Sequence, residues 1–168
     1  MKSRTAVAVF ATALLAYGNA YAAVHGDHGT NAHEQKSPKK KRVLETPFGR
    51  EGDPRKVQRV IRIDTSDAMR YFPDQIRVKR GDTVRFVVRN RGAVPHEMVL
   101  GTMDGLKKHA TEMKQSAGME HDEPNVAHVA PGATGRIVWQ FTKAGEFYYG
   151  CLIPGHFDAG MIGTIVVR

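Results

Sequence analysis

Apolar and polar residues alternate in several short segments between residue 57 and the C-terminus. Alternation with a period of two predicts strands that bury one face and expose the other, as is typical of antiparallel sheets. Several short strands at this spacing predict a β-sandwich or a barrel. A β-branched run over Ile162–Val167 predicts a closing strand. The alternating apolar positions are Ile61, Ile63, Ile76, Val78, Val84, Phe86, Val88, Ile137, Trp139, Phe141, Phe147, Tyr149 and Cys151.

A different pattern interrupts the predicted strands between residues 101 and 130. Met103, Leu106, Ala110 and Met113 recur at helical spacing, with charged residues between them. This spacing predicts a short amphipathic helix around residues 103–115, inserted between two strands.

The first residues have the pattern of a signal peptide. Lys2 and Arg4 precede an uncharged apolar run, Ala6–Tyr17, and Ala20-Tyr21-Ala22 provides the small residues that signal peptidase recognises. We predict a signal peptide over residues 1–22, cleavage after Ala22 and export to the periplasm. The apolar run is shorter than the roughly 20 residues needed to cross a bilayer, so no membrane anchor is expected after cleavage.

Residues 23–56 are rich in Gly, Lys, Pro and His and lack periodic apolar positions. This composition predicts a disordered lead-in, followed by one domain over residues 57–168. The chain has a formal net charge of +8, and this lead-in holds eight Lys or Arg against five Asp or Glu. Because nucleic-acid binding needs a basic stripe on the folded part, this distribution argues against a nucleic-acid partner. The positive charge favours solubility or the steering of an acidic partner.

Cys151 is the only cysteine of the 168 residues. In an oxidising compartment an unpaired cysteine is a free thiol, an intermolecular link or a metal ligand. A free thiol would be open to oxidation there, so metal binding is the interpretation that protects it.

A thiol, an imidazole and a thioether share one short segment, at Cys151, His156 and Met161, and His96 lies upstream. A thiolate suits Cu(I), and imidazole suits both Cu(I) and Cu(II). Two histidines, one cysteine and a weak axial methionine form a copper site that transfers electrons. Zinc would also accept Cys and His, although it favours harder or additional thiolate ligands over a thioether. The alternative without a metal is a buried core thiol, since free Cys is among the most buried residue types.

Residues from about Tyr71 to Arg168 resemble the cupredoxins, the family of plastocyanin, azurin, auracyanin and stellacyanin. The resemblance rests on the segment Tyr71–Phe86 and on the spacing Cys151-x₄-His156-x₄-Met161, which is close to that of auracyanin. It implies an all-β Greek-key β-sandwich with copper near one end. It further implies that His96, Cys151, His156 and Met161 are the ligands, and that electrons pass through an exposed His156.

The chain resembles, more narrowly, bacterial periplasmic cupredoxins associated with copper tolerance. The features behind this are Pro95–Leu100, the Met- and His-containing insert and the His-bearing N-terminus. Glu97 follows the first histidine, where azurin and plastocyanin carry Asn. The hydrogen bonds near the thiolate are therefore expected to differ, and such bonds tune a metal site.

Further His and Met residues are candidates for accessory copper sites. His25 and His28 lie close to the predicted mature N-terminus, where the amine, backbone nitrogens and an imidazole form a square-planar arrangement that suits Cu(II). A solvated polar tail is an equally good interpretation. Met119 and His121 lie in a polar part of the insert and are the other accessory candidates.

The residues and the resemblance together predict a monomeric periplasmic protein that transfers one electron at a copper centre and serves copper tolerance, with an unidentified redox partner. The alternative is a copper-sequestering or copper-delivery protein with accessory His and Met sites. An enzyme is not expected, because one Cys supports one such centre and the chain has no His-x-His pair for a catalytic copper cluster.

Overall fold

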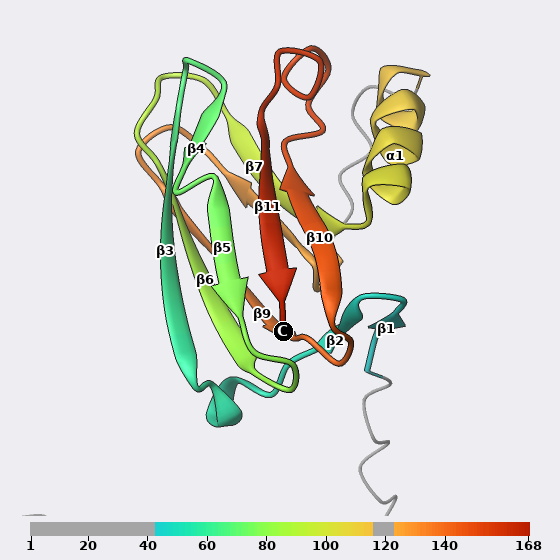
Figure 1. Cartoon of the computed structure of the whole chain (residues 1–168). Helices are drawn as coiled ribbons and strands as arrows, with labels where there is room; N and C mark the ends of the chain where they lie inside the picture. The colour runs from blue at the N-terminus through green and yellow to red at the C-terminus, as the bar shows by residue number, and fades with distance from the viewer. Residues whose placement is uncertain (1–42, 116–122) are drawn as a thin grey trace, which may run out of the picture. The chain divides into compact units, whose positions relative to one another are not determined.

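The computed structural model describes residues 43–115 and 123–168, which all belong to one compact unit. Two β-sheets pack face to face, and one helix lies beside the second sheet (Figure 1). The first sheet has the order β1 (Glu45–Thr46), β2 (Gly49–Glu51), β9 (Thr134–Gln140), β6 (Thr83–Asn90), β3 (Arg59–Ser66) and β4 (Arg70–Phe72). The second has the order β5 (Gln75–Val78), β11 (Ile162–Val167), β10 (Gly145–Gly150), β7 (His96–Gly101) and β8 (Val126–Val129).

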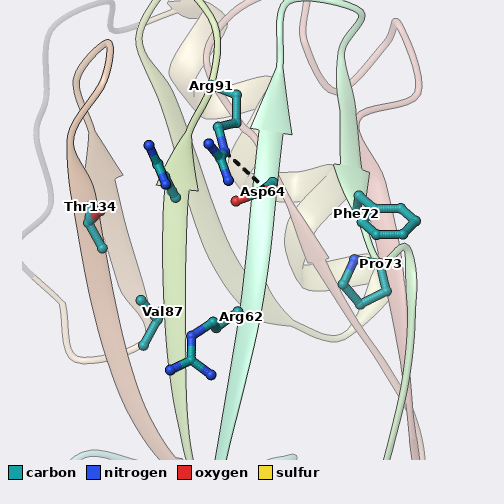
Figure 2. A pocket seen from close by; sticks show the side chains of 8 residues that line it. Arg62, Asp64, Phe72, Pro73, Val87, Arg91 and Thr134 are labelled. Carbon is teal, nitrogen blue, oxygen red and sulfur yellow. Dashed lines mark ion pairs between the residues drawn. The ribbon is translucent and has the colours of Figure 1, made fainter.

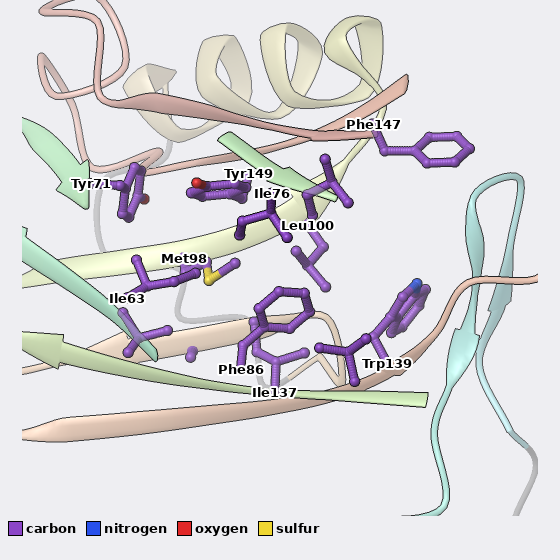
Figure 3. Packing of buried hydrophobic residues seen from close by; sticks show 14 of the residues in the cluster. Ile63, Tyr71, Ile76, Phe86, Met98, Leu100, Ile137, Trp139, Phe147 and Tyr149 are labelled. Atoms are coloured by element: carbon purple, nitrogen blue, oxygen red, sulfur yellow. The ribbon is translucent and has the colours of Figure 1, made fainter. Parts of the chain in front are cut away.

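The predicted sandwich is confirmed, and its core is made of the alternating positions of both sheets (Figure 3). Phe86, Ile137 and Trp139 from the first sheet and Tyr149 from the second are all fully buried. Burying such side chains contributes about 1.5–3 kcal/mol each, so the period-two pattern identifies the face that stabilises the fold.

The sheets are mixed, so the expectation of antiparallel pairing is wrong for two strand pairs. β3 and β6 pair in parallel, with Ile63 opposite Val88, and β5 and β11 pair in parallel, with Val78 opposite Val167. Alternation reports which face of a strand is buried, and it carries no information about the direction of the neighbouring strand.

The folded part begins earlier than residue 57. Residues 45–56, which were expected to belong to the disordered lead-in, form β1, β2 and the 3₁₀ helix Pro54–Lys56. β2 pairs with β9, and the buried Phe48 stacks on Trp139 with ring centroids 5.0 Å apart. These strands are too short to produce an alternating pattern. The signal peptide over residues 1–22 and the lead-in up to residue 42 lie outside the described residues and stay predictions.

The helical insert is confirmed as α1, Met103–Gln115. Leu106 and Ala110 are buried, whereas Met103 and Met113 are only partly so. Leu106 packs in a small cluster with Leu152, the residue after Cys151. Among the described residues, no helix has the length and apolar character needed to cross a membrane.

The second sheet brings three chain segments to one end of the sandwich. β7 and β10 are antiparallel, with Val99 opposite Gly150, so β7 begins where β10 ends. β11 begins at the same level, with Ile162 opposite Gly150. The loop from β10 to β11 therefore lies at the end opposite to the C-terminus (Figure 1), next to the first residue of β7, which is His96.

Candidate metal centre

Three of the predicted ligands converge at this end of the sandwich. One ligand atom each from His96, Cys151 and His156 lie within 4.8 Å of one another. The Cys151 Sγ is 3.3 Å from His156 Nδ1, and the two imidazole rings have centroids 5.2 Å apart. Cys151 and His156 follow His96 by 55 and 60 positions in the sequence, yet the three residues form one compact cluster in the structure. Their donor atoms are soft or borderline ligands and therefore suit a transition metal.

The two ring nitrogens of His96 have different surroundings. Its side chain is fully buried, and Nε2 lies 3.3 Å from Asp67 Oδ1. The buried Nδ1 has no hydrogen-bond partner among the described residues. An unpartnered buried nitrogen is costly, unless it serves as a ligand for a metal held by the cluster.

Cys151 is fully buried. Burial raises the pKa of its thiol to about 12, with a further increase from the Glu97 carboxylate, while hydrogen bonds from the backbone N–H groups of Glu97 and Ile153 lower it. Without a metal the thiol therefore keeps its proton at neutral pH. Burial and the neighbouring His96 lower the pKa of His156, so its imidazole is more readily neutral and able to bind a metal.

Backbone hydrogen bonds hold the loop that carries the donors. The Cys151 N–H donates to the Met161 carbonyl at 3.1 Å, and the Met161 N–H donates to the His156 carbonyl at 3.1 Å. The Met161 side chain is fully buried. Gly155 and Gly160 adopt φ values of 89° and 86°, a left-handed conformation that favours glycine. Met161 is thus tied through its backbone to the two other ligand candidates of the loop.

Glu97 connects the loop of Cys151 to the sheet. Its side chain is almost completely buried; Oε1 accepts the Leu152 N–H at 2.7 Å, and Oε2 lies 3.1 Å from His128 Nδ1. The Glu97 carboxylate therefore accepts a hydrogen bond from Leu152, the residue after Cys151. Position 97 is the one at which the sequence predicted hydrogen bonds different from those of azurin and plastocyanin.

Asp67 is the residue of the site that sequence reasoning missed. It lies between β3 and β4, 29 positions from His96, and it accepts hydrogen bonds from the N–H groups of Ala93 and Val94. An Asp between two predicted strands is normally interpreted as a turn residue with no further role. Nothing in the sequence pairs it with a histidine in a different loop.

The accessory metal candidates cannot be placed in this site. His25 and His28 lie in residues 1–42, and Met119 and His121 lie in residues 116–122, so all of them are outside the described residues.

A hollow of about 350 Å³ lies on the outer face of the first sheet (Figure 2). It contains an ion pair between Arg91 Nε and Asp64 Oδ2, 3.1 Å apart. None of the four predicted ligands lines it. Its walls are Arg62, Asp64, Phe72, Pro73, Val87, Arg89, Arg91 and Thr134.

The cluster at the loop fits copper. A cysteine sulfur and two imidazole nitrogens are the strong ligands of copper sites that transfer electrons, with a methionine as a weaker one. The unpartnered Nδ1 of His96 provides a nitrogen that no other described group uses, and the Cys151 sulfur lies 3.3 Å from His156 Nδ1. Met161, the predicted weaker ligand, is fully buried.

Comparisons with known proteins agree with this arrangement. Residues 57–168 match the family described as copper binding proteins, plastocyanin/azurin family. The chain is 49% identical over 162 residues to the copper-resistant cuproprotein CopI of Rubrivivax gelatinosus, covering 96% of this chain and 92% of that protein. It is 33% identical over 150 residues to the protein of the same name from Pseudomonas aeruginosa, covering 72% and 82%.

The fold is similar to that of auracyanin B, with a TM-score of 0.61 and 21% identity over 74% of this chain and 99% of that one. The family match and the donor atoms identify copper as the metal that the chain binds. The chain belongs to the plastocyanin/azurin family of copper-binding proteins.

Proposed function

We propose that His96, Cys151, His156 and Met161 hold a type 1 copper ion and that this site transfers single electrons. The proposal is carried by the convergence of the Cys151 thiol and two imidazoles, whose ligand atoms lie within 4.8 Å of one another. The thiol sulfur and the two Nδ1 atoms would be the strong ligands of the copper, and the Met161 sulfur would be a weaker one. Copper bound there supplies a centre that alternates between Cu(I) and Cu(II).

The chain's contribution is to hold the segments that carry the predicted ligands in place. The hydrogen bonds joining Cys151, His156 and Met161 run between backbone atoms, and the Leu152 N–H is fixed by the buried Glu97. Because none of these bonds uses a predicted ligand atom, they can stay in place when the charge of the site changes. Burial of Cys151 also keeps water away from the sulfur.

Electrons are proposed to pass through His156. Its side chain is only partly buried, whereas His96 and Cys151 are buried. His156 is therefore the ligand candidate that a redox partner can approach most closely from solution.

The proposed physiological role is copper tolerance in the periplasm. It is supported by 49% identity to a protein named copper-resistant cuproprotein and by the predicted signal peptide. As predicted, the chain is not an enzyme, which is in keeping with its family of copper-binding proteins.

Redox titration of the copper-loaded mature protein tests electron transfer. We expect one electron to be taken up reversibly per copper, with the metal retained in both states. The variant Met161→Leu keeps a buried apolar side chain but removes the thioether, so copper should stay bound while the reduction potential rises. Release of copper on reduction of the wild type would contradict the proposal.

Copper stoichiometry distinguishes an electron carrier from a sequestering or delivery protein. One copper per chain supports the carrier, whereas additional copper that is lost after changing His25 or His121 supports sequestration. Deletion of the gene in its host should cause sensitivity to copper that is rescued by the wild type and not by Cys151→Ala. Growth on copper unchanged by the deletion would contradict a role in tolerance.

A further inference from the structure

The Asp67 carboxylate joins three groups on a segment that is distant in sequence. Its Oδ2 accepts the Ala93 N–H at 2.8 Å, and its Oδ1 accepts the Val94 N–H at 3.3 Å. The same Oδ1 lies 3.3 Å from His96 Nε2. One side chain on the β3–β4 connection therefore holds both the loop before β7 and the first imidazole of the metal centre.

The loop is built to let this carboxylate come close. A Cβ added to Gly92 would lie 1.8 Å from Asp67 Oδ1, so a larger residue there would displace the carboxylate from its present position. On the inner side, the buried Asn90 donates to the Val94 carbonyl at 2.8 Å and accepts the Gly92 N–H at 2.8 Å. Asn90 thus secures the backbone of the loop, and Asp67 is the group that also reaches the His96 ring.

The chemistry of a carboxylate decides which nitrogen of His96 is free to bind a metal. An ionised carboxylate can only accept hydrogen bonds, so the nitrogen facing it must carry the proton. Nε2 faces Asp67, which leaves Nδ1 with its lone pair. Nδ1 is the buried atom without a hydrogen-bond partner among the described residues, and it belongs to the same ring that meets His156.

We propose that Asp67 is a positioning residue of the copper site, which holds His96 in the Nε2–H tautomer and uses its negative charge, through the imidazole, to favour Cu(II) over Cu(I). This inference rests on the proposed function for the identity of the bound metal. A carboxylate on the far nitrogen makes the imidazole a stronger donor. A stronger donor stabilises the higher charge, so Asp67 lowers the reduction potential.

Two variants of Asp67 separate its geometry from its charge. Asp67→Asn keeps an oxygen that can accept from Nε2 but removes the negative charge, and Asp67→Ala removes both. The Asp67 side chain is 44% exposed, so both variants should fold. Asp64→Asn is the matched control: it removes the same charge from the preceding strand and breaks a contact to Arg91 of the same loop, yet Asp64 does not bond to His96.

The first readout is the tautomer of His96 in the metal-free protein, measured by long-range ¹H–¹⁵N NMR. We expect the Nε2–H form in the wild type, in Asp64→Asn and in Asp67→Asn, and a measurable Nδ1–H population in Asp67→Ala. A merely structural role of Asp67 would leave the tautomer unchanged. Finding His96 as the Nδ1–H tautomer in the wild type would overturn the inference.

The second readout is the copper-loaded protein. We expect Asp67→Ala to bind Cu(II) about 10- to 100-fold more weakly and both Asp67 variants to have higher potentials than Asp64→Asn. If Cu(I) affinity is unchanged, each tenfold loss of Cu(II) affinity raises the potential by about 59 mV. Potentials of the Asp67 variants equal to that of Asp64→Asn would overturn the inference. A wild type that binds copper without a thiolate absorption band would instead refute the proposed function, and the tautomer measurement would still test Asp67.

Discussion

The Cys151 thiol shows how its surroundings set the chemistry of a single residue. Burial raises its pKa to about 12, so the sulfur becomes a ligand only when a metal replaces the proton. The neighbouring His156 has the opposite tendency, because burial lowers its pKa. Both shifts favour the uncharged forms of Cys151 and His156, which limits the cost of keeping these two groups buried.

Copper binding at pH 7 should accordingly release about one proton per copper, from Cys151. Titration calorimetry in buffers with different ionisation enthalpies measures this number. The apparent affinity should rise by about tenfold per pH unit above neutrality, as long as the thiol remains the group that loses a proton. Release of two protons per copper would contradict this account.

The four ligand candidates could be named from the sequence, whereas the residues that hold them could not. Cys151, His156 and Met161 lie within eleven positions of one another, and their side chains have recognisable affinities for copper. Asp67 acts on His96 only because β3 ends beside the start of β7, and this proximity is a property of the folded sheets. Glu97 could be noticed as a departure from related proteins, but its bond to Leu152 required the structure.

At the scale of elements, the alternating strands were predictable and the buried or very short ones were not. β7 is buried at all six positions, so it lacks the alternation that identifies β3, β6 and β9. β1 and β2 contribute one core residue, Phe48, and are too short to show a period. The direction of pairing depends on how the chain crosses between the sheets, which no local pattern encodes.

Helix α1 supports the metal loop from outside. Leu106 packs with Leu152, and Lys114 Nζ lies 2.7 Å from Asp158 Oδ2 of the loop. The helix starts after Thr102, whose Oγ1 accepts the Gly105 N–H at 3.2 Å. Such a cap satisfies an N–H group that the helix itself leaves without a partner.

Removing this cap should destabilise the protein without abolishing copper binding. We expect Thr102→Ala to lower the free energy of unfolding by about 1 kcal/mol, as measured by urea denaturation. Thr102→Ser keeps the hydroxyl and is the matched control, with a much smaller effect. An alanine variant as stable as the serine variant would show that the cap does not contribute.

On the scale of the whole molecule, positive charge gathers on the outer face of the first sheet. Arg62 of β3 and Arg136 of β9 pair with the same residue of β6, Val87, from its two sides, so all three residues share the outer face. Arg85 and Arg89 occupy other outward positions of β6. Asp64 is the sole carboxylate among the residues that line the adjoining hollow, and it pairs with Arg91 (Figure 2). Arg89 lies at the end of β6 that leads into the loop of His96, so this basic face adjoins the metal end.

The reduced protein should therefore react with a small anionic oxidant, such as hexacyanoferrate(III), more slowly as salt is added. Opposite charges attract within about 10 Å at 0.1 M ionic strength, and salt screens this attraction. Arg89→Glu should slow the reaction at low salt more than Lys143→Glu, because Lys143 precedes β10 at the opposite end. Equal effects of the two substitutions in stopped-flow kinetics would contradict steering by this face.

The central claim is that the Cys151 thiolate binds copper together with His96 and His156. Its most direct test is the visible absorption of the purified mature protein during titration with Cu(II). We expect an intense thiolate-to-copper charge-transfer band that saturates at one copper per chain and is absent from Cys151→Ala. A wild type that binds copper without colour, or a Cys151→Ala variant that keeps the band, would contradict the account.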